Sequence, residues 1–151
     1  WGAPQADSFE SMNPMFFNFE PHFIPKGGFI LISPKHKNFL NSGYTNFNLK
    51  NGVAQKQTVM INGEDAKRKK ISNGEILVLF NDLGESNVVA NVTDEIVEGV
   101  LMVNHGYWMC HVKGNTVNAL VSSNPSNIGK GITVNDTVVF IKKRRINAAP
   151  Y

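Results

Sequence analysis

The chain contains 151 residues, of which 42% are hydrophobic, 10% aromatic and 18% charged, and its formal net charge is +3. This length corresponds to one domain, or to one domain with an arm, and the hydrophobic content excludes a largely disordered protein. No apolar run approaches the roughly 18 residues that a membrane span requires, so the sequence predicts a globular domain without a transmembrane segment.

The N-terminal segment contains three prolines and several phenylalanines without a regular period. We interpret residues 1–22 as an arm or interdomain segment, residues 23–145 as a folded barrel domain and residues 146–151 as a C-terminal tail. Exposed aromatic side chains are costly, so the arm is expected to lie against the barrel or a neighbouring domain. The chain begins at Trp1, which predicts a segment of a longer or processed protein.

From residue 28 onward, short apolar segments alternate with turn residues. Six segments rich in β-branched or aromatic side chains are predicted as strands: residues 29–33, 58–61, 75–80, 87–92, 100–103 and 137–141. Residues 64–70 are predicted as a short helix, and residues 37–40 could form a second one. The sequence Asn-Asp-Leu-Gly at 81–84 favours a hairpin between its flanking strands. Several strands are apolar on both faces, which predicts a closed, mostly β barrel.

The sequence contains neither a G-x-G-x-x-G motif nor a phosphate-binding P-loop. Cys110 is the single cysteine, so an internal disulfide is excluded; this fits a reducing, cytoplasmic location and leaves export of a parent enzyme open. Cys110 and His111 are adjacent, and neighbours on a strand point to opposite faces, so they are not expected to bind one metal ion. We interpret Cys110 as a structural residue rather than a nucleophile.

Two short basic runs lie at residues 67–70 and 142–145. Such runs can neutralise phosphates and bind nucleic acid. The first follows two acidic residues in the predicted helix, and the second ends a strand near the C-terminus. Neither is accompanied by a recognition helix or an aromatic-basic stripe. We therefore interpret both runs as solvated surface charge and expect no nucleic-acid partner.

Ser, Asn and His residues are concentrated in the turns at the ends of the predicted strands. These segments are residues 33–36, 41–43, 104–108, 115–118 and 134–136. Each is weak evidence alone, because Asn and Ser favour turns for local reasons. Together they can hydrogen-bond a ligand rich in amides, hydroxyls and phosphates without any proton-transfer group. The pattern indicates binding rather than catalysis.

Several of these segments follow one another in an order that resembles a known family. In chain order the elements are Ser33-Pro34-Lys35-His36, Asn41-Ser42-Gly43, Asp65-Ala66, Ile71 with Gly74, Asn81 with Gly84, Gly106 with Trp108, Asn118 with Leu120, and Asn135-Asp136. Over residues 28–142 this order resembles the molybdopterin dinucleotide-binding domain of the dimethyl sulfoxide reductase family of molybdenum and tungsten oxidoreductases. In that family the domain is usually the C-terminal one.

The resemblance implies a six-stranded double-psi β-barrel with one or two short helices. It implies a domain or subunit that binds molybdopterin guanine dinucleotide, with molybdenum or tungsten held by a parent oxidoreductase. In this family the protein ligand of the metal and any iron–sulfur cysteines sit in other domains. The chain alone is therefore expected to be catalytically silent, with the remaining domains or catalytic subunit of the parent enzyme as its partners.

The resemblance also implies which residues contact the cofactor. They are Ser33, His36, Asn41, Ser42, His105, Gly106, Trp108, Asn118 and Asn135. No residue is implied as a catalytic group or as a metal ligand. A second interpretation stays open, in which a double-psi barrel acts as an adaptor or recognition module through a surface groove and needs no cofactor.

Overall fold

The structure is a computed structural model, and it describes residues 24–36, 43, 56–109, 112, 114–123 and 137–144. In these residues the elements are β1 (Phe29–Ile32), β2 (Thr58–Asn62), the helix α2 (Gly63–Lys69), β3 (Ile76–Phe80), β4 (Glu85–Thr93), β5 (Val100–Val103), the 3-10 helix η3 (Val117–Leu120) and β6 (Thr137–Lys143). Every predicted strand is present, with each end within two residues of its predicted position. The helix considered at 37–40, the arm and the tail lie outside the described residues, so the proposed domain bounds stay a prediction.

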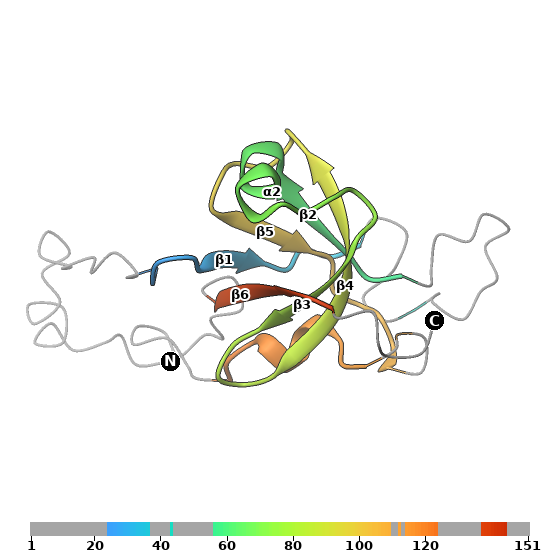
Figure 1. The fold of residues 1–151 in the computed structure, drawn as a ribbon. Helices are drawn as coiled ribbons and strands as arrows, with labels where there is room; N and C mark the ends of the chain where they lie inside the picture. The colour runs from blue at the N-terminus through green and yellow to red at the C-terminus, as the bar shows by residue number, and fades with distance from the viewer. Residues whose placement is uncertain are drawn as a thin grey trace, which may run out of the picture.

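The strands form a closed barrel in the order β1-β5-β2-β4-β3-β6 (Figure 1). β1 pairs with β5 and β2 with β4 in parallel, whereas the remaining ladders of the described barrel are antiparallel. Exchanging β1 with β4, β2 with β5 and β3 with β6 leaves this set of pairings unchanged. The strand pairing therefore has an internal two-fold symmetry, and its two parallel pairs interlock the halves. This is the double-psi barrel that the resemblance implied.

Alternate residues of the strands fill the barrel, because successive side chains of a strand point to opposite faces. Each of the six strands of the described barrel contributes an aliphatic side chain that is at most 1% exposed: Leu31, Val59, Ile61, Leu77, Leu79, Val88, Leu101, Val103 and Val139. The apolar strand segments thus build the core. The polar turn residues are left to the connections at the two ends of the barrel.

The strand directions divide these connections between the two ends. β1, β3 and β5 run in one direction, and β2, β4 and β6 run in the other. The connections at residues 33–57, 81–84 and 104–136 therefore all leave and re-enter the barrel at one end, which we call the loop end. α2 and residues 94–99 lie at the opposite end, which we call the helix end.

Polar contacts fasten α2 to residues 94–99 at the helix end. Asn62 precedes α2, and its Nδ2 donates to the carbonyl of Ile96 at 2.7 Å. The buried carboxylate of Asp65 accepts a hydrogen bond of 2.7 Å from the N–H of Gly99. These two bonds attach α2 and the residue before it to residues 94–99. The two connections at the helix end are therefore hydrogen-bonded to each other.

Candidate functional site

At the loop end, the segments that follow β1 and β5 lie side by side. Lys35 and His105 form a parallel bridge, and the N–H of His105 donates to the carbonyl of Pro34 at 3.0 Å. The Nδ1 of His105 lies 2.7 Å from the carbonyl oxygen of Ser33. The pairing of β1 with β5 thus continues beyond both strands and brings the predicted residues Ser33 and His105 together.

The ring of His36 packs against Tyr107 from the neighbouring segment. The ring centroids are 6.1 Å apart with an interplanar angle of 74°, an edge-to-face arrangement. Both residues are 8% exposed. Burial raises the pKa of the Tyr107 phenol, so it stays protonated and able to donate a hydrogen bond at neutral pH. Tyr107 was not among the predicted site residues, because in the sequence it resembles an ordinary core aromatic.

Gly106 and Trp108 have different roles in the same segment. Gly106 has a φ of 106°, a backbone conformation that favours glycine, so it turns the chain between its two neighbours. Trp108 is 45% exposed and the following Met109 is 65% exposed. Trp108 therefore lies partly exposed at the loop end rather than in the core.

Asn118 lies on η3, with its side chain exposed while Val117 and Leu120 are buried. The N–H of Val117 donates to the side chain of Gln57, which precedes β2. Because β2 begins at the loop end, η3 belongs to the same end of the barrel as the segment at 33–36. A direct approach of Asn118 to that segment stays a prediction.

Three of the predicted contact residues, Asn41, Ser42 and Asn135, lie outside the described residues, as do Cys110 and His111. Within the described part of the chain, no group of three His, Cys, Asp or Glu side chains is placed to hold a metal ion. The same part of the chain contains no helix that is both long and apolar enough to cross a membrane.

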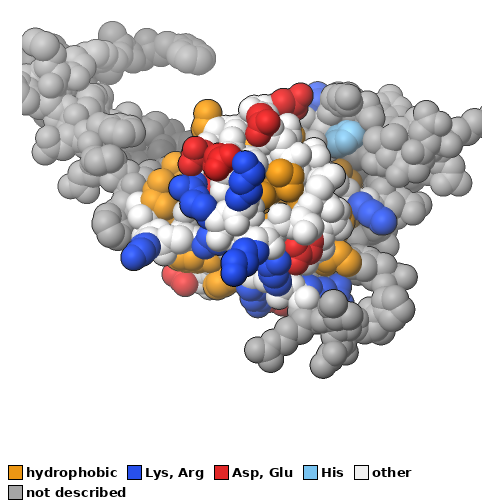
Figure 2. Space-filling view, turned by 45° about the horizontal axis from the view of Figure 1, so that its top comes forward, with side chains coloured by type: hydrophobic (Ala, Val, Ile, Leu, Met, Phe, Trp, Pro, Cys, Tyr) orange, Lys and Arg blue, Asp and Glu red, His pale blue; other side chains and the backbone are white. Residues whose placement is uncertain are grey.

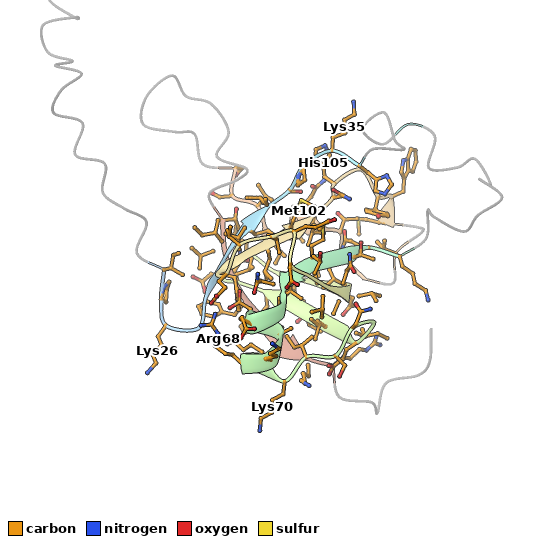
Figure 3. All side chains as sticks on the ribbon, turned by 90° about the horizontal axis from the view of Figure 1, so that it is seen from above. Lys26, Lys35, Arg68, Lys70, Met102 and His105 are labelled. Atoms are coloured by element: carbon orange, nitrogen blue, oxygen red, sulfur yellow. The ribbon has the colours of Figure 1, made fainter. Side chains whose placement is uncertain are left out.

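The loop end also carries positive charge. Lys35 and Lys56 are exposed there, and neither forms an ion pair with another described residue. In Figure 3, Lys35 and His105 lie at one end of the ribbon, and Lys70 lies at the other. The loop end thus combines two exposed cations and the exposed carboxylate of Asp82 with neutral polar and aromatic side chains.

At least four of the eight residues in the two basic runs are paired with acidic side chains. Figure 2 shows lysine and arginine side chains lying among aspartate and glutamate side chains on one face. The pairs in the described residues include Lys67–Glu64 (2.7 Å), Arg68–Glu98 (2.8 Å), Lys142–Glu85 (2.7 Å) and Lys143–Glu75 (3.0 Å). Lys143 also donates to the carbonyl of Lys70, so the runs meet at the surface. This pairing supports their interpretation as structural surface charge.

Residues 29–138 match the family described as "Molydopterin dinucleotide binding domain". Dimethyl sulfoxide reductase DmsA of Escherichia coli (strain K12) is 27% identical over 151 residues, covering 95% of this chain and 18% of that protein. Trimethylamine-N-oxide reductase of Salmonella typhi is 33% identical over 101 residues, covering 60% of this chain and 12% of that protein. The chain therefore spans less than a fifth of the length of these curated relatives.

Among solved structures, acetylene hydratase from Pelobacter acetylenicus has a similar fold, with a TM-score of 0.62 and 12% identity. The similarity covers 79% of this chain and 19% of that one, and it supports the fold alone. The family match begins at the first residue of β1 and reaches the second residue of β6, so it includes both parallel strand pairs and every loop-end connection. The chain belongs to the molybdopterin dinucleotide-binding domain family of the dimethyl sulfoxide reductase-type oxidoreductases.

Proposed function

We propose that this chain binds molybdopterin guanine dinucleotide at the loop end, as the cofactor-binding domain of a molybdenum- or tungsten-dependent oxidoreductase. The observation that carries the proposal is that two long connections, residues 33–57 and 104–136, begin and end at one end of the barrel. All the proposed contact residues belong to these two connections. One extended dinucleotide can therefore contact both of them.

The described side chains of the loop end fit the chemistry of such a ligand. Lys35 and Lys56 carry charges that can pair with its phosphates. Thr137, at the beginning of β6, is 6% exposed, and its Oγ1 has no hydrogen-bond partner. Buried hydroxyls ordinarily have a partner, and a polar ligand group can supply one. The half-exposed ring of Trp108 is suited to stacking.

In this proposal the chain binds and orients the cofactor without transferring protons. His36 and Asn118 act as hydrogen-bonding contacts, and Trp108 forms a wall of the site. The other proposed contacts are Ser33, Asn41, Ser42, His105, Gly106 and Asn135. When bound, the cofactor carries the metal ion that supplies the redox chemistry.

The catalytic centre of the parent enzyme is proposed to lie mostly outside this chain. The curated relatives are reductases of which the chain covers 18% or 12%. The protein ligand of the metal and the substrate site are assigned to the remaining domains of that enzyme, which are therefore the partners of this chain. The alternative, an adaptor barrel without a cofactor, is an outcome of the experiment that follows.

Asn118→Ala and His36→Ala are each expected to weaken cofactor binding by about 1–3 kcal/mol, because each leaves polar ligand atoms without a partner. This corresponds to roughly a 5- to 150-fold loss of affinity. The measurement is the molybdenum, tungsten and guanine nucleotide content of the purified full-length enzyme. Asn91→Ala is the matched control, since Asn91 is an exposed asparagine of β4 near the helix end.

The control variant is expected to retain the cofactor content of the unsubstituted enzyme. If Asn118→Ala and His36→Ala retain it as well, the two segments do not share a ligand site. If the unsubstituted enzyme contains no metal and no pterin nucleotide, the adaptor interpretation replaces the proposed function.

Replacing Lys142, Lys143 and Arg144 together with Gln is expected to leave cofactor content unchanged. β6 ends toward the helix end, and two of these cations are already paired: Lys142 with Glu85 at the beginning of β4, and Lys143 with Glu75 just before β3. The loss of these exposed pairs is expected to cost about 0–1 kcal/mol of stability each. The same metal and nucleotide assay, combined with denaturant unfolding, measures both effects. A marked loss of cofactor would show that the second basic run binds phosphate.

A further inference from the structure

A buried polar network joins β2, β4 and the segment that leads into η3. Gln57 is 3% exposed and Ser86 is 1% exposed, although both are polar. The Nε2 of Gln57 donates to the Oγ of Ser86 at 2.7 Å and to the carbonyl of Asn87 at 3.2 Å. Its Oε1 accepts from the N–H of Val117 at 3.0 Å. The Oγ of Ser86 in turn donates to the carbonyl of Asn115 at 2.8 Å. Gln57 and Ser86 therefore each have hydrogen-bond partners on two different segments.

Gln57 provides the cap at the beginning of η3. Val117 is the first residue of this 3-10 helix, and the first N–H groups of a helix have no acceptor within it. Thr116 precedes η3 and makes no side-chain capping bond. The acceptor comes instead from Gln57, which lies 60 residues earlier in the chain.

The other end of η3 is held by the β3–β4 hairpin. The Nδ2 of Asn81 donates to the carbonyl of Leu120 at 2.7 Å, and its Oδ1 accepts from the N–H of Gly84 at 3.2 Å. A Cβ on Gly84 would lie 2.9 Å from the carbonyl oxygen of Ala119, so the hairpin backbone packs directly against η3. The short helix is therefore fixed at both ends by side chains from outside it.

We propose that Gln57, together with Ser86, is a positioning residue that fixes η3 so that Asn118 faces the bound ligand. A four-residue 3-10 helix has little stability of its own, so burial of Val117 and Leu120 and the bonds to the barrel keep it in place. The exposed Asn118 side chain is the polar group that this arrangement presents. The inference rests on the proposed function, since that function supplies the ligand that Asn118 meets.

The test is a double-mutant cycle between Gln57→Leu and Asn118→Ala in the full-length enzyme. Gln57→Leu alone is expected to lower the apparent affinity for the cofactor roughly tenfold, by releasing the cap of η3. In the Asn118→Ala background it is expected to have no further effect, because it acts through Asn118. Cofactor content is measured as metal and released guanine nucleotide.

A second readout does not depend on the cofactor. Hydrogen exchange of the Val117 amide is expected to be faster in Gln57→Leu, with or without Asn118→Ala, because the amide loses its acceptor. Ser86→Ala is the milder variant and is expected to act in the same direction if Gln57→Leu does not fold. Asn62→Leu is the matched control: it removes a side-chain bond at the helix end and is expected to lower stability without lowering cofactor content.

Three outcomes separate this inference from the proposed function. An equal loss of cofactor in both backgrounds, or no loss in either, overturns the positioning role of Gln57. Unchanged exchange at Val117 overturns it as well. The absence of pterin nucleotide from the unsubstituted enzyme overturns the proposed function, and with it the ligand that Asn118 is positioned to meet, while Val117 exchange still decides whether Gln57 holds η3.

Discussion

Leu101→Ala is expected to lower the free energy of unfolding by about 2–5 kcal/mol, the usual cost of a cavity at a fully buried leucine. Leu101 is 0% exposed on β5. It pairs with Leu31 of β1 on one side and with Ile61 of β2 on the other, and both of these are also 0% exposed. The cavity would therefore open in the middle of the barrel, where strand neighbours on both sides restrict collapse.

Denaturant unfolding of Leu101→Ala measures this loss, and Met102→Ala is its control. Met102 follows Leu101 on β5 and is only partly buried, because its side chain points to the other face. The loss is expected to be smaller at Met102. An equal or larger loss at Met102 would mean that the inner face of β5 has been assigned to the wrong residues.

Asp65→Ala is expected to lower the free energy of unfolding by about 1–3 kcal/mol, because it leaves the N–H of Gly99 without its acceptor. The Asp65 side chain is 4% exposed, and it also binds Arg68. Arg68 pairs in turn with Glu98 at 2.8 Å. The substitution thus removes a direct bond between α2 and the turn before β5 and loosens the ion-paired bridge beside it. Denaturant unfolding measures the loss.

Two further variants, one at Asp65 and one at its exposed neighbour Glu64, separate the effect of burial from the effect of charge. Asp65→Asn keeps an oxygen that can accept from Gly99, so its loss of stability is expected to be smaller than that of Asp65→Ala. Glu64→Ala removes an exposed acid that pairs with Lys67 at 2.7 Å, a kind of pair that contributes about 0–1 kcal/mol. If Glu64→Ala were as damaging as Asp65→Ala, the clamp at the helix end would not depend on the buried carboxylate.

The strands could be predicted because their pattern is local: apolar segments of strand length end at Asn, Gly or Asp. β4 shows the limit of this reasoning, since it begins at Glu85, two residues before its predicted start. Glu85 and Ser86 are polar and follow a turn, which favours a loop in the sequence. Ser86 is nevertheless 1% exposed, because Gln57 supplies a donor for its hydroxyl. Burial of this kind depends on a partner that is distant in the chain.

The adjacency of two candidate segments follows from the strand pattern, while their contact with a ligand stays a prediction. Polar residues after β1 and β5 mark their strand ends, and parallel pairing brings these segments together. The roles of Tyr107 and Gln57 could not be predicted, because Tyr107 packs against His36 and Gln57 caps a helix 60 residues later. Neither contact produces a regular spacing. The two-fold symmetry of the strand pairing could not be predicted from the sequence either. It depends on which strands are neighbours, and residue spacing within a strand carries no information about that.

Every strand pair in the described barrel joins one half of the chain to the other. β1, β2 and β3 pair with β4, β5 and β6, and none of the first three pairs with another of them. During synthesis, the first half therefore has no sheet to join until the second half leaves the ribosome. Apart from the β3–β4 hairpin, the barrel assembles through contacts of long sequence separation, which makes slow folding the expected behaviour. The loop end is complete only after both halves have met.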